Sequence, residues 1–452
     1  MAPRPAVRNR ARTVESDTFD RFRTFCDRLI GTKPDRADHG KEAAIAAFVS
    51  LVTDDDQYRE LARSLLSTSL DHYEACFERR EAVDWYAFSR INAIAAYDWL
   101  YDHLSSDDRR ALGRRILDVV DAVQPTEERD SFRFENWGGI GGGFYGTPVL
   151  PWYAGVALAG TGVGDERAQS LLENGYDRHR ELLDFRASHA GDDGGGASAT
   201  LNYLLQAYPW ATFNFFHSHR TAFGTSIVPE YDFPALLPGY VFWNWLPDRQ
   251  QFGTGDDPHV TNDLPLEEMH IHCSQIVHLY ADSHPREAAF AAWLRERLPR
   301  ESHYAELRLP FTRFLLAGGS DVDPDGPPLD AELPLGRHFE GMGQAYFRSG
   351  SGPGDMYAQF TCGGGDTNHK HFDANNFCLY RNGFLALDTG SRPLPGLHRS
   401  HYYATTLAHN CVLVRMPGEE FTPHWGRTEP AEAETDHPVP NTGGQRHTGG
   451  SI

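Results

Sequence analysis

The residues best suited to metal binding or proton transfer gather in the last third of the chain. His369 and His371 stand two apart in DTNHKHFDANN, Asp388 lies in FLALDTG, and His409 lies in LAHNCVLV. Side chains two apart on an extended chain point the same way, so His369 and His371 can share one face. Two imidazoles and one carboxylate form a ligand set expected of zinc, with the fourth position open or held by water.

The segment between these residues predicts a β-hairpin. Asn382-Gly383, between NFCLYR and FLALDTG, is typical of a two-residue turn. A hairpin that turns there sets Asp388 opposite Phe377, about 20 Å along the strand from His371. His371 must therefore lie in a loop that folds back if it is to meet Asp388. A second pair, His270 and His272, lies in the helical part of the sequence, and we interpret it as structural.

Strand-like runs surround this hairpin. They are short, rich in aromatic and β-branched residues, and separated by Gly and Asn. The runs are GQAYFRS, MYAQFTC, NFCLYR, FLALDTG and HNCVLVR. We expect an antiparallel β domain over 335–452, preceded by a Pro/Asp/Gly-rich linker over 318–334. The polar tail after Pro417 predicts that this domain is incomplete.

The preceding residues, 16–317, predict a helical domain, because their apolar residues recur at helical spacing. Val83–Leu104 is one such stretch, and another follows a polar break, where Ser105 or Ser106 with Asp107 and Asp108 predicts an N-cap and an acidic first turn. Further helices are predicted near 17–31, 41–53, 57–79, 165–188, 199–219, 265–281 and 285–297. Stacked helical hairpins build a solenoid or a closed toroid. Residues 1–15 are predicted to be disordered.

The order of the C-terminal motifs resembles the heparinase II/III-like family of polysaccharide lyases. H-x-H-x-D is followed by a strand, a glycine turn, a strand ending in Asp, then Tyr-Tyr and Ala-His-Asn. The matching stretch begins near HFEGMGQAYFRSG, continues through NHKHFDANNFCLYRNGFLALDTG and closes with HYYATTLAHNCVLV. The resemblance implies an N-terminal (α/α) toroid, then an antiparallel β-sandwich-like domain, and cleavage of a uronic-acid-containing glycan by β-elimination.

The resemblance also implies roles for individual residues. His369 resembles the family's catalytic histidine, and a structural zinc ion would be held by His371, Asp388 and His409. Tyr203, ten residues beyond Asp193-Gly194, resembles the catalytic tyrosine of the toroid. The remaining assignments are Asn136 in ENWGG, which would neutralise the substrate carboxylate, and Tyr402, Tyr403 and Arg348, which would contact the substrate.

The chemistry explains these residue types. Elimination beside a uronate removes the C5 proton, and an anionic carboxylate makes that proton weakly acidic. A donor to the carboxylate stabilises the enolate-like intermediate by roughly 3–4 kcal/mol. His369 and Tyr203 can then divide the roles of base and acid, in an order that depends on the epimer of the substrate.

Charge and composition exclude other classes of protein. The net charge of −21 disfavours nucleic acids as partners, and no apolar run approaches the ~20 residues of a membrane span. An anionic glycan would therefore need local arginines, such as Arg348 and Arg381. The basic start, MAPRPAVRNRARTVESDTFDRF, lacks the apolar stretch of a signal peptide, so we expect a cytoplasmic protein unless a leader is missing from the chain.

Two other functions stay open. Helical toroids also host glycoside hydrolases with paired carboxylates, for which Asp192, Asp193, Asp256 and Asp257 are candidates. The other alternative is a glycan-binding relative that holds zinc without turnover.

Overall fold

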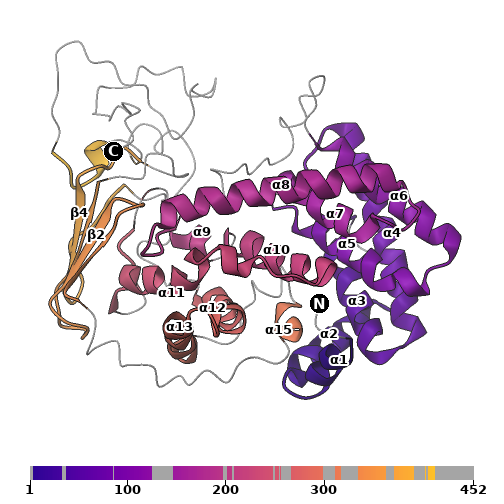
Figure 1. Ribbon diagram of the computed structural model, residues 1–452, viewed down its shortest axis with the longest axis horizontal. Coiled ribbons are helices and arrows are strands. Elements are labelled where there is room, and N and C mark those ends of the chain that lie inside the picture. Colours follow the sequence, from indigo (N-terminus) through magenta and orange to yellow (C-terminus); the bar gives the residue numbers. More distant parts are fainter. Residues whose placement is uncertain are drawn as a thin grey trace, which may run out of the picture.

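A computed structural model describes residues 4–32, 37–84, 86–124, 146–196, 201–205, 208–247, 250–253, 255, 266–298, 311–316, 334–362, 371–390, 403 and 406–412. Within these ranges helices occupy the chain up to residue 315, and one antiparallel sheet follows (Figure 1). The predicted order of a helical part before an antiparallel sheet is confirmed. No helix in the described ranges has the length and apolarity needed to cross a membrane.

The helices of the described ranges pack mainly against sequence neighbours, with α3 on α4 and α5, α7 on α8, and α12 on α13. Their bounds are α1 (Arg4–Arg12), α2 (Ser16–Leu29), α3 (Gly40–Thr53), α4 (Asp56–Arg79), α5 (Phe88–Leu100), α6 (Ser106–Ala122), α7 (Leu150–Leu158), α8 (Asp165–Ala190), α9 (Leu201–Leu205), α10 (Tyr208–Phe223), α11 (Phe233–Asn244), α12 (Leu266–Tyr280), α13 (Pro285–Arg297) and α15 (Thr312–Leu315). The predicted cap is confirmed, because Ser105 Oγ accepts a 3.0 Å hydrogen bond from the Asp108 amide at the start of α6.

The prediction of a disordered N-terminus over 1–15 is wrong for the part that the structure describes. Residues 4–12 form α1, whose Val7 and Ala11, four residues apart, are buried. Arg8 Nε donates to the Leu51 carbonyl at 2.8 Å and Arg12 Nη2 to the Val52 carbonyl at 3.0 Å, at the end of α3. Guanidinium groups stabilise the carbonyls at a helix C-terminus, so arginines that look like a solvated tail anchor this helix.

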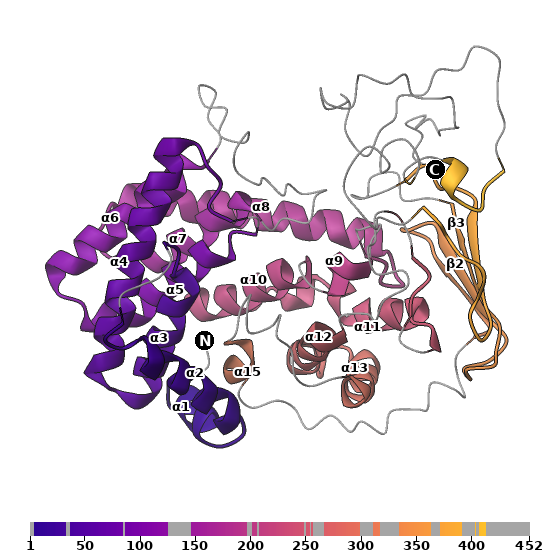
Figure 2. The ribbon, with the colours of Figure 1, turned by 180° about the vertical axis from the view of Figure 1, so that it is seen from behind.

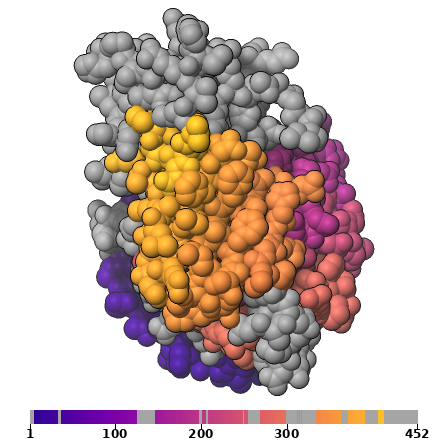
Figure 3. Space-filling model, turned by 90° about the vertical axis from the view of Figure 1, so that its left-hand side faces the viewer, coloured from indigo at the N-terminus to yellow at the C-terminus, as the bar shows by residue number. Residues whose placement is uncertain are grey.

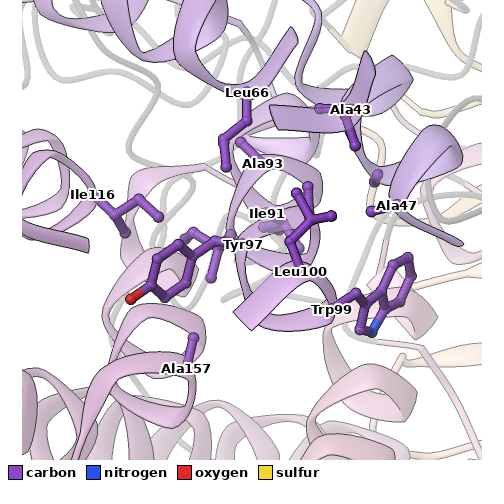
Figure 4. Close-up of a cluster of buried hydrophobic side chains, with 14 of the residues drawn as sticks. Ala43, Ala47, Leu66, Ile91, Ala93, Tyr97, Trp99, Leu100, Ile116 and Ala157 are labelled. Atoms are coloured by element: carbon purple, nitrogen blue, oxygen red, sulfur yellow. The ribbon is translucent and has the colours of Figure 1, made fainter. Parts of the chain in front are cut away.

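Two apolar cores lie inside the described part. The first core is built mainly from α1–α7 and α15, with part of α8. Figure 4 labels ten of its residues, Ala43, Ala47, Leu66, Ile91, Ala93, Tyr97, Trp99, Leu100, Ile116 and Ala157. The second core is richer in aromatic residues. It joins α8–α13 to the inner face of the sheet, with members such as Tyr240, Trp243 and Tyr346.

The sheet is a five-stranded antiparallel meander in the order β1-β2-β3-β4-β5. Its strands are β1 (Gly336–Phe339), β2 (Gln344–Arg348), β3 (Tyr357–Thr361), β4 (Asn376–Tyr380) and β5 (Phe384–Ala386). Four of the predicted runs supply β2–β5. The fifth, HNCVLVR, was expected as a strand, but its described residues, 409–412, form none; they are held by hydrogen bonds to the loop after β5 and to β4.

The two faces of the sheet have different surroundings. The inner face packs on α11 through buried polar contacts, in which Tyr240 Oη donates to Gln344 Oε1 and Tyr346 Oη donates to Asn244 Oδ1, each at 2.7 Å. The outer face, seen in Figure 3, carries exposed apolar side chains. These include Phe347, Phe360, Phe377 and Leu385. The described residues show one sheet layer, and the second layer of a sandwich does not fall among them.

Candidate functional site

Four buried polar residues converge beside β4 and β5. His371 and Asp373 precede β4, Asp388 follows β5, and His409 follows the short 3-10 helix η8 (Thr406–Ala408). All four side chains are buried, with His371 and Asp388 each only 2% exposed. Buried ionisable groups need compensating partners, so their mutual geometry decides what the cluster can do.

A turn before β4 brings the first two residues back toward the others. The Asn376 amide donates to the Asp373 carbonyl at 2.9 Å, and Asn375 has φ 73°, the left-handed region that asparagine tolerates. The chain therefore folds back where we predicted that it must. His371 reaches His409, and their ring centroids lie 5.3 Å apart.

The predicted hairpin is confirmed as well. Asn382 and Gly383 both have positive φ, at 54° and 130°, as the tight turn requires. Leu379 pairs with Ala386, and continuing this register sets Asp388 opposite Phe377 as expected. The hairpin places Asp388 beside the start of β4, where Asn376 Nδ2 donates to Asp388 Oδ2 at 2.9 Å.

Asp388 and His409 form a hydrogen-bonded pair. His409 Nδ1 lies 2.8 Å from Asp388 Oδ1, and the same oxygen accepts from the Gly390 amide at 2.8 Å. Burial lowers the pKa of His409, but the charge and hydrogen bond of Asp388 outweigh it, so the net shift of the pKa is upward. Gly390 is required at its position, because a Cβ there would collide with the His409 ring.

The cluster has the donors of a cation site. Asp373, Asp388 and His409 each bring one ligand atom within 4.8 Å of the others. His409 Nε2 is buried and makes no hydrogen bond of ordinary geometry within the described ranges. Ligands around a tetrahedral zinc lie about 3.4 Å apart, so small side-chain movements bring these atoms to one ion. Two buried carboxylates beside an imidazole donor therefore fit a divalent metal.

Asp373 was not among the residues assigned to the metal, although the signal was present. It is the Asp of H-x-H-x-D and stands two residues after His371. Asn376 and Asn410 were also missed. The Asn410 amide donates to Asn376 Oδ1 at 3.0 Å, and Asn410 Nδ2 donates to the Phe377 and Leu387 carbonyls. These amides hold the segment of His409 against the hairpin. The Ala-His-Asn motif was the sequence signal that could have indicated the role of Asn410.

The other predicted site residues that the structure describes are not part of this buried cluster. Tyr203 lies half-buried on α9 and stacks on Tyr208, with ring centroids 5.5 Å apart, at the edge of the second core. Tyr403 is half-buried, and its main chain lies beside His409. His369, Asn136 and Tyr402 lie outside the described residues.

Arg348 lies in an aromatic cage between the sheet and α11. Its guanidinium carbon is 4.0 Å from the Trp243 ring centroid and 5.0 Å from that of Phe242, and the residue is 8% exposed. Such cation–π contacts stabilise packing. The cage gives Arg348 a place in the domain junction, and its contact with substrate stays a prediction.

The loop that leads to Tyr203 docks on the sheet. The Asp193 carboxylate accepts a hydrogen bond from the backbone of Glu340 in the β1–β2 turn, and burial raises the pKa of this carboxyl. Of the carboxylates considered for hydrolysis, Asp192 and Asp193 belong to this loop, whereas Asp256 and Asp257 lie outside the described residues. A contact that joins the two domains therefore occupies one oxygen of Asp193.

His272 of the second H-x-H pair has a structural place, as interpreted. His272 Nε2 lies 3.0 Å from the Leu205 carbonyl, and the ring stacks on Phe213 inside the helical part. The His272 ring is fully buried there.

Comparisons with known proteins found a match to a family model and similar solved structures. Residues 331–438 match the family described as heparinase II/III-like, C-terminal. A solved heparinase III is 14% identical, with 84% of this chain and 55% of that chain covered and a TM-score of 0.48. A mutant heparan sulfate lyase from Pedobacter heparinus is 13% identical, with 82% and 52% covered and a TM-score of 0.44. The comparison with curated proteins found no match.

The chain spans about half the length of these solved structures. The matched residues include the turn before β4, the β4–β5 hairpin and the segment of His409. The expected resemblance is confirmed, since residues 331–438 match the model of the heparinase II/III-like C-terminal family.

Proposed function

We propose that the chain is a polysaccharide or oligosaccharide lyase that cleaves a uronic-acid-containing glycan by β-elimination. The observation that carries the proposal is the family match over 331–438, the segment that contains the buried cluster of His371, Asp373, Asp388 and His409.

In this mechanism His369 and Tyr203 exchange protons with the substrate, one as base at C5 and the other as acid at the departing O4. Asn136 donates to the substrate carboxylate and stabilises the charge that develops when the C5 proton leaves. The burial of His371 supports the proposal that the cluster anchors the chain and does not itself react with the substrate.

We further propose that the cluster binds a zinc ion through Asp388 and His409, with Asp373 and His371 as the adjacent donors. A bound zinc would supply structural cross-linking of the three segments that meet there. The protein's own contribution is the second coordination sphere, in which Asn376 orients Asp388, as outer-shell partners orient metal ligands.

Metal content tests this part. Dialysed protein should take up one equivalent of zinc, whereas His409→Ala should take up none. The matched control is His272→Ala, another buried histidine, which should keep full uptake. Equal uptake by both variants would place the metal elsewhere or nowhere.

The activity is tested by incubating the protein with a panel of uronate polysaccharides and their short oligomers. Elimination creates an unsaturated sugar that absorbs in the ultraviolet and consumes no water. We expect absorbance to rise, His369→Ala to abolish the rise, and His338→Ala, at an exposed position of β1, to leave it unchanged. New reducing ends without absorbance would contradict elimination and favour hydrolysis. Zinc uptake with no product across the panel would favour the binding-only relative.

A further inference from the structure

The charge of this chain is unevenly distributed. Residues 1–41 contain ten Lys and Arg against six Asp and Glu, so they carry about four net positive charges. The other 411 residues then carry −25. One basic end on an acidic protein attracts anions locally, while the remainder repels them.

A groove between α2 and α3 lies in this basic region and has a volume of about 580 Å³. Arg21 and Arg28 of α2 and Lys41 of α3 supply its cationic side chains. Its apolar lining comes from Phe22, Phe25 and Ile45. The Arg28 guanidinium lies 5.9 Å from the Phe25 ring centroid. A lining with both cationic and apolar side chains suits a ligand that has both anionic groups and C–H faces, as an acidic sugar does.

The spacing of the arginines fits a repeating anion. Arg21 and Arg28 are seven residues apart on one helix, hence two turns and about 10.5 Å apart along one face. In a glycan with one uronate in each disaccharide, the carboxylates recur at every second sugar, which is a comparable interval. Guanidinium groups bind carboxylates and sulfates in bidentate geometry.

Acidic residues also line the groove, but they leave it net positive. Asp17 and Asp20 belong to the lining, and Asp20 Oδ1 pairs at 3.0 Å with Arg23, which is not part of it. Three cationic groups therefore face two carboxylates, one of which is already bound by an arginine from outside.

The groove is remote from the candidate active site. Figures 1 and 2 both show α1 and α2 in the half of the molecule away from the sheet, with α8–α13 between them and the sheet. A ligand held there does not occupy the cluster of His371, Asp388 and His409.

We propose that the α2–α3 groove is a second binding site for an acidic oligosaccharide, which holds a glycan chain away from the reacting centre. The choice of a glycan among anionic polymers rests on the proposed function.

The test measures the dissociation constant of a fluorescent hexauronate at low salt for the whole chain. Arg21→Ala/Arg28→Ala should weaken binding at least tenfold and flatten its salt dependence. The matched control, Arg63→Ala/Arg110→Ala, removes two arginines outside the groove, one half-buried and one exposed, and should bind like wild type. Equal binding by both double variants would overturn the proposal, and so would tighter binding of anionic lipid vesicles than of the hexauronate.

Elimination is followed in parallel to separate this proposal from the proposed function. If the groove variant loses binding while wild type forms no unsaturated product, the groove stands and the lyase activity fails. If wild type forms the product while the groove variant binds normally, the activity stands and the groove fails.

Discussion

The first core and the sheet junction are held together in different ways. In the first core, α3 is buried on almost every side and packs through small residues such as Ala43 and Ala47, while Phe48 meets Phe314 at 4.8 Å. At the junction, buried hydroxyl and amide groups of α11, β2 and β3 form one hydrogen-bonded network.

The two regions differ in how precisely their contacts fix the positions of the packed elements. Apolar packing is non-directional, and such cores accept repacking when volume is kept. A buried polar network has one satisfied arrangement, and each group left without its partner is expensive. We infer that the first core supplies bulk stability, whereas the junction fixes the orientation of the sheet and hence of the buried cluster at β4 and β5.

The largest expected effect comes from the cluster. Asp388→Ala removes the acceptor of Asn376, Gly390 and His409 together, so the free energy of unfolding should fall by about 3–5 kcal/mol. The control is Asp355→Ala in the β2–β3 turn, a more exposed carboxylate that accepts from Ser349 and Gly352 and should cost about 1 kcal/mol. Urea denaturation measures both losses. Equal losses would mean that the cluster adds nothing beyond an ordinary turn.

Overpacking the helical part should have a smaller effect. Gly155 of α7 touches the backbone of Leu172 on α8, so Gly155→Ala should lower the free energy of unfolding by about 2 kcal/mol. Gly239→Ala in α11 meets open space and should raise it by about 0.5–1 kcal/mol, because alanine favours a helix. Thermal denaturation of both variants checks the signs. If Gly155→Ala stabilised the protein, α7 and α8 would have room to move apart, which would contradict close packing of the helical part.

One hydroxyl at the junction gives a sharper comparison. Tyr346→Phe deletes the group that donates to Asn244 and accepts from Gln359 at 3.0 Å, which should cost about 1–2 kcal/mol of unfolding free energy. Tyr357→Phe, whose Oη donates to the Gly352 carbonyl near the surface, should cost less. If the metal site orients independently of the junction, zinc affinity will be unchanged in Tyr346→Phe. We expect zinc affinity to fall.

Periodicity predicted amphipathic helices such as α6, and it also predicted α3, although α3 is buried on almost every side. α7 and α11 were missed. Both are apolar on all sides because both are buried all round, and α11 also contains Pro238. The helix predicted from Val83 begins only at Phe88, after Ala87 adopts the left-handed conformation, which no spacing rule anticipates.

The parts of the candidate site that depend on residues close together in the sequence were predictable. The Asn382-Gly383 turn fixes the register and hence the position of Asp388. The hydrogen bond from the Asn410 amide to Asn376 Oδ1 joins residues 34 positions apart, and such a contact depends on the tertiary fold. Asp373 could have been assigned from H-x-H-x-D, but only the turn at Asn375 shows that its carboxylate reaches His409.

The smallest expected effect concerns α8, the helix that runs from the first core to the sheet (Figure 1). Burial lowers the pKa of His179 to about 3, and the ring stacks on Phe215 at 4.4 Å. In the unfolded chain this histidine has its ordinary pKa of 6.5 and takes up a proton as the pH falls, whereas the folded protein takes up none. The stability is therefore full above pH 6.5 and is lost below it, by about 1.4 kcal/mol between about pH 7.5 and about pH 5.5. His179→Gln should unfold with a shallower pH dependence by that amount, measured by urea denaturation at both pH values. An unchanged slope would mean that His179 is protonated in the folded state, so that α8 is less tightly enclosed than the two cores it connects.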